Sequence, residues 1–231
     1  MSPKRPQSAG TMPGGVWLRE PPAPQRSPSL TRERIVAATV ETLDRDGMAG
    51  LSMRRLAEAL DVHATSLYWY VATRDELFDL ALDEVFGEVA LPGHQSWRED
   101  VAAFMDGLRA ALLRHPWAGP LASSRPLMGP HALARAEFVH AALVAAGFSG
   151  LNLSAAAAAV SNYVIGTASV EAAWRQEDQG GSRRALGEHI QRRADLYPAL
   201  AAHPPGTDDG WDAHFTRGMD FLLAGLESYR S

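Results

Sequence analysis

The sequence predicts an all-α protein, with an N-terminal three-helix helix-turn-helix head and a C-terminal helical bundle. Three observations support this fold class. Apolar residues recur at helical spacing through most of the chain after residue 30. Polar capping residues stand where these stretches begin, and glycine or proline stands where they end. No run of alternating β-branched residues, the pattern of a half-buried strand, stands out.

The composition is that of an ordinary soluble globular protein, because 46% of the 231 residues are hydrophobic and 21% are charged. The chain has no cysteine, which excludes a disulfide framework and a thiolate metal site. Its longest uninterrupted apolar run, residues 155–160, is far shorter than the ~20 residues that span a membrane. No apolar stretch follows Lys4 and Arg5, so we expect no secretory signal. We therefore predict a cytoplasmic protein with no membrane partner.

Charge is distributed unevenly along the chain. Residues 1–74 contain 10 basic and 7 acidic side chains, whereas residues 75–231 contain 12 basic and 20 acidic ones. The two parts thus carry +3 and −8, within a total of −5. A basic head on an acidic body is what a modular DNA-binding protein shows, because only the head must neutralise phosphates.

The first 29 residues are predicted to form a flexible arm. They contain seven prolines with glycine and serine between them, so no helix can propagate there. A leader without a role is the interpretation we favour. The alternative is a basic arm that contacts DNA through Arg19 and Arg26.

Residues 30–76 are predicted to form the head. Thr31 can cap a first helix that Gly47 ends. Ser52 can cap a second helix that runs through Leu60. A tight turn at 61–62 leads to a short third helix over about 63–70.

Residues 77–231 form the predicted C-terminal domain. A capping box, Thr73 with Glu76, opens a fourth helix that stops at Pro92, and a second box, Ser96 with Glu99, opens a fifth that ends near His115. Four prolines in 116–130 predict a loop that can include one turn of helix. Further helices are predicted from Pro130 to Gly147, over about 154–176 and over about 208–228.

A helix, a tight turn and a short helix form the geometry that places a second helix in the DNA major groove. The third helix carries small polar side chains on its outward positions, which would let it approach base edges. Arg54 can reach a guanine edge or a phosphate, and Arg74 a phosphate. An ordinary helical hairpin that binds a protein partner has the same periodicity, so spacing alone leaves both interpretations open.

The stretch 31–78 resembles the DNA-binding domain of TetR-type repressors. The resemblance lies in Gly47–Ser52, Arg55-Leu56-Ala57 and above all Ser66-Leu67-Tyr68-Trp69-Tyr70-Val71. It implies contacts to the DNA backbone from Tyr68 and Arg74, and base reading by Arg54, His63, Ala64, Thr65 and Ser66. Asp61 stands where most of the family has glycine, so we expect a strained or altered turn.

Much of the remaining chain resembles the ligand-binding domain of the tetracycline repressor. The matching segments are Trp97, 109–113, Ser124-Arg125-Pro126, 146–148 and 225–227. The positions that hold the magnesium–drug complex in that protein correspond here to Ala90, Leu121 and Phe104. An apolar wall cannot coordinate a hydrated divalent cation. We therefore expect no magnesium–tetracycline binding and no cofactor.

A mostly apolar pocket with a few polar groups is typical of small-molecule sites. We predict such a pocket from Phe104, Leu108, Leu121, Ser124, Met128, Phe138, Asn162 and Trp174, with Arg125, Tyr163 and Glu171 as further candidates. The same apolar stripe at helical spacing is equally typical of a plain hydrophobic core.

The last helix carries an apolar stripe at helical spacing, and the long helix before it is rich in alanine. The stripe consists of Trp211, Phe215, Met219, Leu222, Leu226 and Tyr229. The TetR resemblance implies that these two helices of each subunit form a four-helix dimer interface. Without the resemblance, the stripe could equally be intramolecular core.

No enzyme signature is present in the sequence. Glu137 and His140 have a spacing that metal sites use, but no third or fourth ligand is evident. There is no glycine-rich phosphate loop, no Gly-x-Ser-x-Gly elbow and no His-Glu-x-x-His. We predict a ligand-responsive repressor that releases a palindromic operator on binding a small, mostly apolar molecule. The alternatives are an activator or ligand-insensitive regulator of the same fold, and a helical protein-interaction module.

Overall fold

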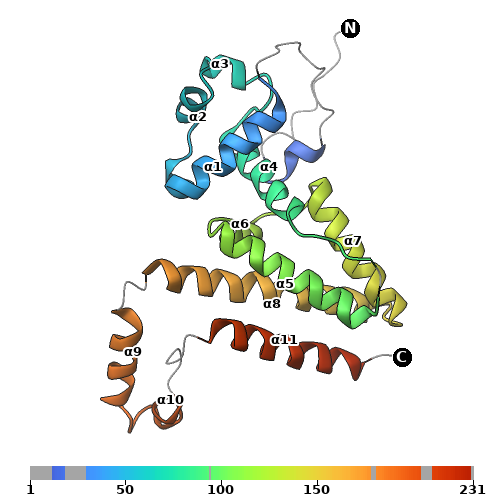
Figure 1. The fold of residues 1–231 in the computed structure, drawn as a ribbon, viewed down its shortest axis with the longest axis vertical. Helices are drawn as coiled ribbons and strands as arrows, with labels where there is room; N and C mark the ends of the chain where they lie inside the picture. Colours follow the sequence, from blue (N-terminus) through green and yellow to red (C-terminus); the bar gives the residue numbers. More distant parts are fainter. Residues whose placement is uncertain (1–11, 19–29, 94, 178–180, 204–209, 230–231) are drawn as a thin grey trace.

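The computed structural model describes residues 12–18, 30–93, 95–177, 181–203 and 210–229. All regular elements among the described residues are helices, with no strand, which confirms the predicted all-α class (Figure 1). The elements are the 3-10 helix η1 (Gly15–Leu18) and the helices α1 (Arg32–Gly50), α2 (Met53–Ala59), α3 (Ala64–Leu67), α4 (Arg74–Gly87), α5 (Trp97–Arg114), α6 (Ala118–Ser124), α7 (Pro130–Ala145), α8 (Gly150–Glu177), α9 (Ser182–Gln191), α10 (Pro198–Ala202) and α11 (Trp211–Glu227).

Helices α1, α2 and α3 form the head, and their starts lie where the capping residues predict. The Thr31 hydroxyl accepts the backbone N–H of Arg34, and Ser52 accepts that of Arg55, each at 3.2 Å. Gly47 interrupts α1 with a φ of 65°, the conformation that glycine adopts most readily. The head packs around fully buried leucines and isoleucine, among them Ile35, Leu43, Leu56 and Leu67.

The turn between α2 and α3 depends on a left-handed residue. Asp61 has a φ of 54°, the single positive φ among the described residues other than glycine. This agrees with the family preference for glycine at the position, and aspartate tolerates the conformation better than most residues do.

Helix α4 leaves the head and runs into the body (Figure 1). Its start differs in detail from the predicted capping box. Thr73 does accept the Glu76 N–H at 3.2 Å, but Glu76 reaches the N–H of Ala72, at 2.8 Å, one residue before the cap. The acidic side chains of Glu76, Asp79 and Asp83 are all buried on this helix.

The body is a stack in which α5 lies against α8, with α7 and α11 beside them (Figure 1). The predicted box at Ser96 is present, because Ser96 accepts the Glu99 N–H and Glu99 accepts the Ser96 N–H. Between α5 and α7 the expected loop is wrong in part, since α6 is a seven-residue helix. Pro120 lies in its first turn, where a missing N–H costs no hydrogen bond.

Helix α8 starts at Gly150, four residues before the predicted start, and packs on α5, α6, α7 and α11. By length and composition alone it could cross a membrane, which is weak evidence because core helices pass the same test. Only 33% of its apolar window is buried, so much of its surface is uncovered in a single chain.

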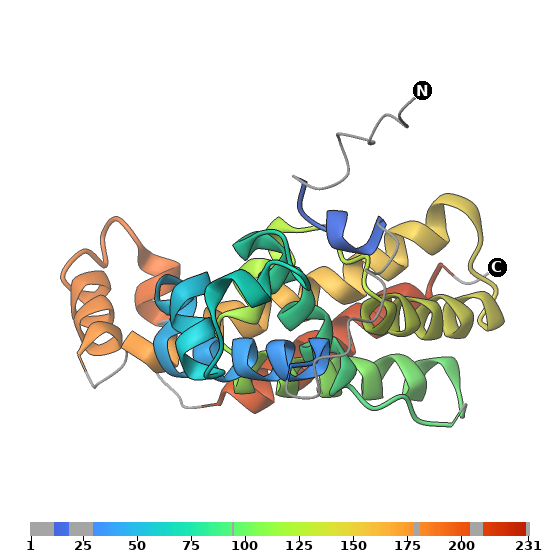
Figure 2. The same ribbon diagram turned by 90° about the horizontal axis from the view of Figure 1, so that it is seen from above.

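Two further parts of the chain differ from the predictions. Residues 12–18 belong to the expected flexible arm, but they contain η1 and pack on α4, with Val16 only 6% exposed. Helices α9 and α10 contact each other and lie at one edge of the molecule in both views (Figures 1 and 2), and Figure 1 shows them at the opposite end from the head.

The turn at Asp61 gives a direct test of the backbone argument. Asp61→Ala keeps a Cβ at positive φ and removes the carboxylate that makes aspartate tolerable there. We expect Asp61→Ala to have a free energy of unfolding about 1 kcal/mol lower than Asp61→Gly, measured by urea denaturation. Equal stabilities would mean that the turn does not require the left-handed conformation.

Candidate functional site

The predicted DNA-reading residues lie on one exposed face of the head. His63, Thr65 and Tyr68 are exposed, and Ala64 and Ser66 are partly so. The opposite side of α3 is held by Leu67, which is fully buried. The α-helical part of α3 is shorter than predicted, and turns that bond Tyr70 and Val71 back to the Leu67 carbonyl continue it. The buried Leu67 side chain therefore anchors this face to the head, and the polar side chains on it point to solvent.

Two arginines flank this face, and both are engaged within the head. The Arg54 side chain is 86% exposed and pairs with Glu58 one turn along α2 at 2.9 Å. The hydrogen bond to Glu58 raises the pKa of Arg54, which keeps its charge. Arg74 donates to the Met48 carbonyl and lies 4.9 Å over the Phe78 ring. Each would have to exchange or share these contacts with DNA.

Sequence reasoning assigned no individual role to two aromatic residues beside this face. The Tyr70 hydroxyl donates to the Leu30 carbonyl at 2.7 Å, which fixes the start of α1 against the third helix. Trp69 is 64% exposed next to Tyr68. The run of three aromatics in a short helix was the available signal, since one short helix cannot bury all three.

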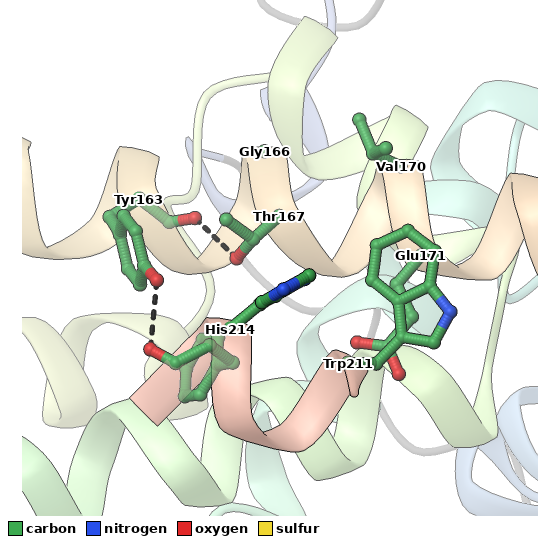
Figure 3. A pocket seen from close by; sticks show the side chains of 8 residues that line it. Tyr163, Gly166, Thr167, Val170, Glu171, Trp211 and His214 are labelled. Carbon is green, nitrogen blue, oxygen red and sulfur yellow. Dashed lines mark hydrogen bonds between the residues drawn. The ribbon is translucent and has the colours of Figure 1, made fainter. Parts of the chain in front are cut away.

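The body holds a cavity of about 240 Å³ between α8 and the start of α11 (Figure 3). Its lining is aromatic and aliphatic with a few polar groups: Tyr163, Gly166, Thr167, Val170, Glu171, Trp211, His214 and Phe215. The Tyr163 hydroxyl donates to the Phe215 carbonyl at 2.8 Å, and Thr167 donates to the Tyr163 carbonyl at 2.6 Å. Burial raises the pKa of Tyr163, so its hydroxyl stays a donor at neutral pH.

An ion network lies at the end of this cavity. Glu171 is 1% exposed and accepts three hydrogen bonds from Arg109, one at 2.8 Å and two at 2.9 Å, and one from Arg175 at 2.5 Å. Arg109 also donates to Asp212 at 2.7 Å and lies 4.7 Å over the Phe215 ring. Burial disfavours the charge of Arg109, but its bonds to Asp212 and Glu171 outweigh this and raise its pKa. The network thus joins α5, α8 and α11.

The predicted ligand residues lie in several places. Phe104, Leu108, Leu121 and Phe138 are buried in the core. Ser124 and Asn162 are exposed, and the Ser124 hydroxyl donates to carbonyls of its own helix. Met128 lines a small recess beside Trp17, and Trp174 is half-buried. None of these eight lines the cavity of Figure 3, whereas the further candidates Tyr163 and Glu171 do. A ligand role for the eight stays a prediction.

The pair Glu137 and His140 has no companion ligands in the described part of the chain, where no group of three metal-binding side chains occurs. His140 Nδ1 lies 2.7 Å from the Ala136 carbonyl, an acceptor, so this nitrogen donates within its own helix.

A short, exposed polar helix on a helix-turn-helix head, joined to a helical body, defines a DNA-binding regulator of the helix-turn-helix class. The family model for bacterial regulatory proteins of the tetR family matches residues 35–81, and the model for the tetracyclin repressor-like C-terminal domain matches residues 90–230. The chain therefore belongs to the TetR family.

Relatives of known name agree with this assignment. An HTH-type transcriptional regulator of Saccharopolyspora erythraea is 56% identical over 93% of this chain and 92% of its own length. The HTH-type transcriptional repressor DrrR1 of Streptomyces coeruleorubidus is 32% identical over 87% of this chain and 78% of its own. The crystal structure of the TetR family protein ActR of Streptomyces coelicolor, in complex with (S)-DNPA, is 30% identical, with a TM-score of 0.77 over 90% of this chain and 100% of that one.

Two arginines of α5 provide a matched test of the buried network. Arg109→Met leaves the buried Glu171 with Arg175 as its remaining ion-pair partner, and we expect a loss of about 3 kcal/mol in the free energy of unfolding. Arg98→Met removes an exposed pair with Asp220 at 3.5 Å, and we expect a loss below about 1 kcal/mol. Chemical denaturation measures both, and equal losses would contradict the role given to burial.

Proposed function

We propose that the protein is a ligand-responsive transcriptional repressor. It binds a palindromic operator as a homodimer and releases it when a small, mostly apolar molecule binds the body. One observation carries this proposal: the exposed face of α3 lies at one end of a helix, α4, whose other end is embedded in the body. The name of DrrR1 as a repressor and the small molecule in the ActR structure support it.

In this proposal the two kinds of DNA contact come from different residues of the head. Arg54, His63, Ala64, Thr65 and Ser66 approach base edges. Arg54, His63 and Thr65 are exposed, and the short side chains of Ala64, Thr65 and Ser66 let the helix come close to the groove. Tyr68 and Arg74 contact the phosphate backbone and fix the register.

The proposed dimer uses the uncovered faces of α8 and α11. Part of the predicted stripe on α11 is instead intramolecular core, because Phe215 and Met219 are buried within the single chain. Leu151 and Val170 on α8 are 82% and 51% exposed, and Phe221 on α11 is 70% exposed. Apolar side chains in such number along two neighbouring helices favour burial against a second copy. To bind a palindromic operator, such a dimer has to present two α3 helices about 34 Å apart, one turn of DNA.

The cavity between α8 and α11 supports a small, mostly apolar effector. Its lining includes the apolar or aromatic side chains of Trp211, Phe215, Tyr163 and Val170, and Thr167, Glu171 and His214 add polar groups. A ligand shifts the equilibrium between two orientations of α4 only by its difference in affinity for them. Release of DNA then follows from a tilt of α4, which moves the two heads out of register.

The proposal includes a cytoplasmic location, no cofactor and no catalysis. The named relatives are transcriptional regulators, which supports the location and the absence of catalysis. An activator of the same fold would share every feature described above. Reporter output in a strain that lacks the gene distinguishes the two, because loss of a repressor raises the output and loss of an activator lowers it.

The decisive experiment is fluorescence anisotropy on a duplex from upstream of the protein's own gene, beside a scrambled duplex, at two salt concentrations. We expect nanomolar binding to the first duplex and a log–log salt slope of about −0.9 for each phosphate contact. Weak and equal binding to both duplexes would overturn specific recognition of that site, and binding without salt dependence would favour a protein-interaction module.

Two variants of the head test the contact residues. Arg54→Ala and Thr65→Ala should each weaken operator binding by about 1–3 kcal/mol while dimerisation, followed by sedimentation, stays unchanged. Arg184→Ala is the matched control, because Arg184 pairs with Glu188 four residues along α9 as Arg54 pairs with Glu58. If operator binding and dimerisation fell together, the assignment of this face would be wrong.

Apolar residues stand at the three positions that correspond to the magnesium–drug ligands of the tetracycline repressor. They predict that this protein is insensitive to tetracycline. Leu121 and Phe104 are buried and Ala90 is exposed, and none of these side chains offers an oxygen or nitrogen to a cation. We expect titration with tetracycline and magnesium, followed by drug fluorescence, to give no saturable binding in the micromolar range. Micromolar binding that depends on magnesium would contradict this.

A further inference from the structure

Residues 12–18, here named the strap, cross the junction between the head and the body. Gly14 donates its backbone N–H to Asp79 of α4 at 2.8 Å. Gly14 has a φ of +79°, and an added Cβ would lie 3.2 Å from the Met128 sulfur, so glycine suits this position. Val16 is 6% exposed, and Trp17 covers a recess lined by α4 and by residues 126–132. The strap is therefore built into the core.

Asp79 is the centre of these contacts. The residue is 5% exposed. Its carboxylate accepts one hydrogen bond from the Arg125 guanidinium, at 3.0 Å, and another from the Gly14 N–H. Arg125 also pairs with Asp75 at 2.7 Å and lies 5.3 Å over the Phe78 ring. A buried carboxylate needs several donors, and the strap supplies one of them. The strap thereby completes a polar link between α4 and the segment after α6.

One turn further along α4, Asp83 fixes the same helix to α7. It accepts the backbone N–H of Ala132 at 2.8 Å and that of His131 at 3.2 Å, at the start of α7. Trp17 packs over this point, because Asp83 and Ala132 line the same recess. On the other side, the Arg32 guanidinium of α1 lies 5.6 Å over the Trp17 ring. The strap thus contacts α1, α4 and the body together.

We propose that the strap is an intrachain clasp that holds α4 in one orientation against the body, and that Gly14, Val16 and Trp17 are positioning residues for operator binding. The inference rests on the proposed function for its operator readout. Any tilt of α4 moves Asp79 and Asp83 relative to α7 and the strap, so it must break the contacts of Gly14 and Trp17. The clasp therefore keeps the two heads in the register that binds DNA.

Two strap residues provide a matched pair of variants. Val16 is buried, whereas Leu18, two residues away, is 59% exposed. With full-length protein we expect Val16→Ser to increase hydrogen exchange at the amides of α4 about tenfold and to weaken operator binding about tenfold, with dimerisation unchanged. Leu18→Ser should change neither. Gly14→Pro removes the N–H and cannot adopt the positive φ, so it should match Val16→Ser.

The two readouts separate the clasp from the proposed function. Hydrogen exchange needs no operator, so it tests the clasp even if the protein binds no DNA. Unchanged exchange at α4 in both Val16→Ser and Gly14→Pro overturns the clasp. Faster exchange with equal or tighter operator binding overturns the positioning role, and an equal effect of Leu18→Ser overturns the specific contribution of the buried residue.

Discussion

The structure depends on how the buried carboxylates of one helix, α4, are paired with donors from other segments. Asp79 and Asp83 lie on the inner side of α4, where a carboxylate without partners would cost several kcal/mol. Their partners come from elsewhere: Arg125, the first amides of α7, and the strap. These partners fix the position of α4 along its length and not only at its ends. Because the head is attached to the first turn of α4, the direction in which α3 points is set by contacts inside the body.

The helix boundaries that could be predicted are those that local chemistry decides. Ser52, Ser96 and Pro130 mark observed starts because a cap or a proline acts within one turn of the chain. Helix α6 and the strap could not be predicted in this way. Both lie in proline-rich sequence, and what orders the strap is a contact between residues 65 positions apart. Composition indicates which segments lack intrinsic helical order, but it does not show which part of the folded chain they pack against.

The two candidate sites differ in predictability for the same reason. Exposure of Thr65 and burial of Leu67 follow from the periodicity of one short helix, so the outward face of the head could be predicted from sequence. The ligand residues depend on which faces of several long helices meet. Phe104 and Phe138 are core, whereas the cavity is formed where α11 returns to α8. Long-range bonds hold α11 there, such as that from Arg109 of α5 to Asp212 of α11, 103 positions apart. Apolar residues have the same spacing along the sequence at core positions and at cavity positions, so the spacing cannot distinguish the two.

The strap also shows how covalent attachment changes the strength of a weak contact. Seven residues with one hydrogen bond and two packed side chains would hardly bind as a free peptide. Joined to α1 by a short stretch of the same chain, they face their groove at an effective concentration in the mM range or above. Proximity, and not affinity, then keeps the segment in place. A modest difference in free energy is enough to displace such a tethered segment. The segment binds again once the competing interaction is removed.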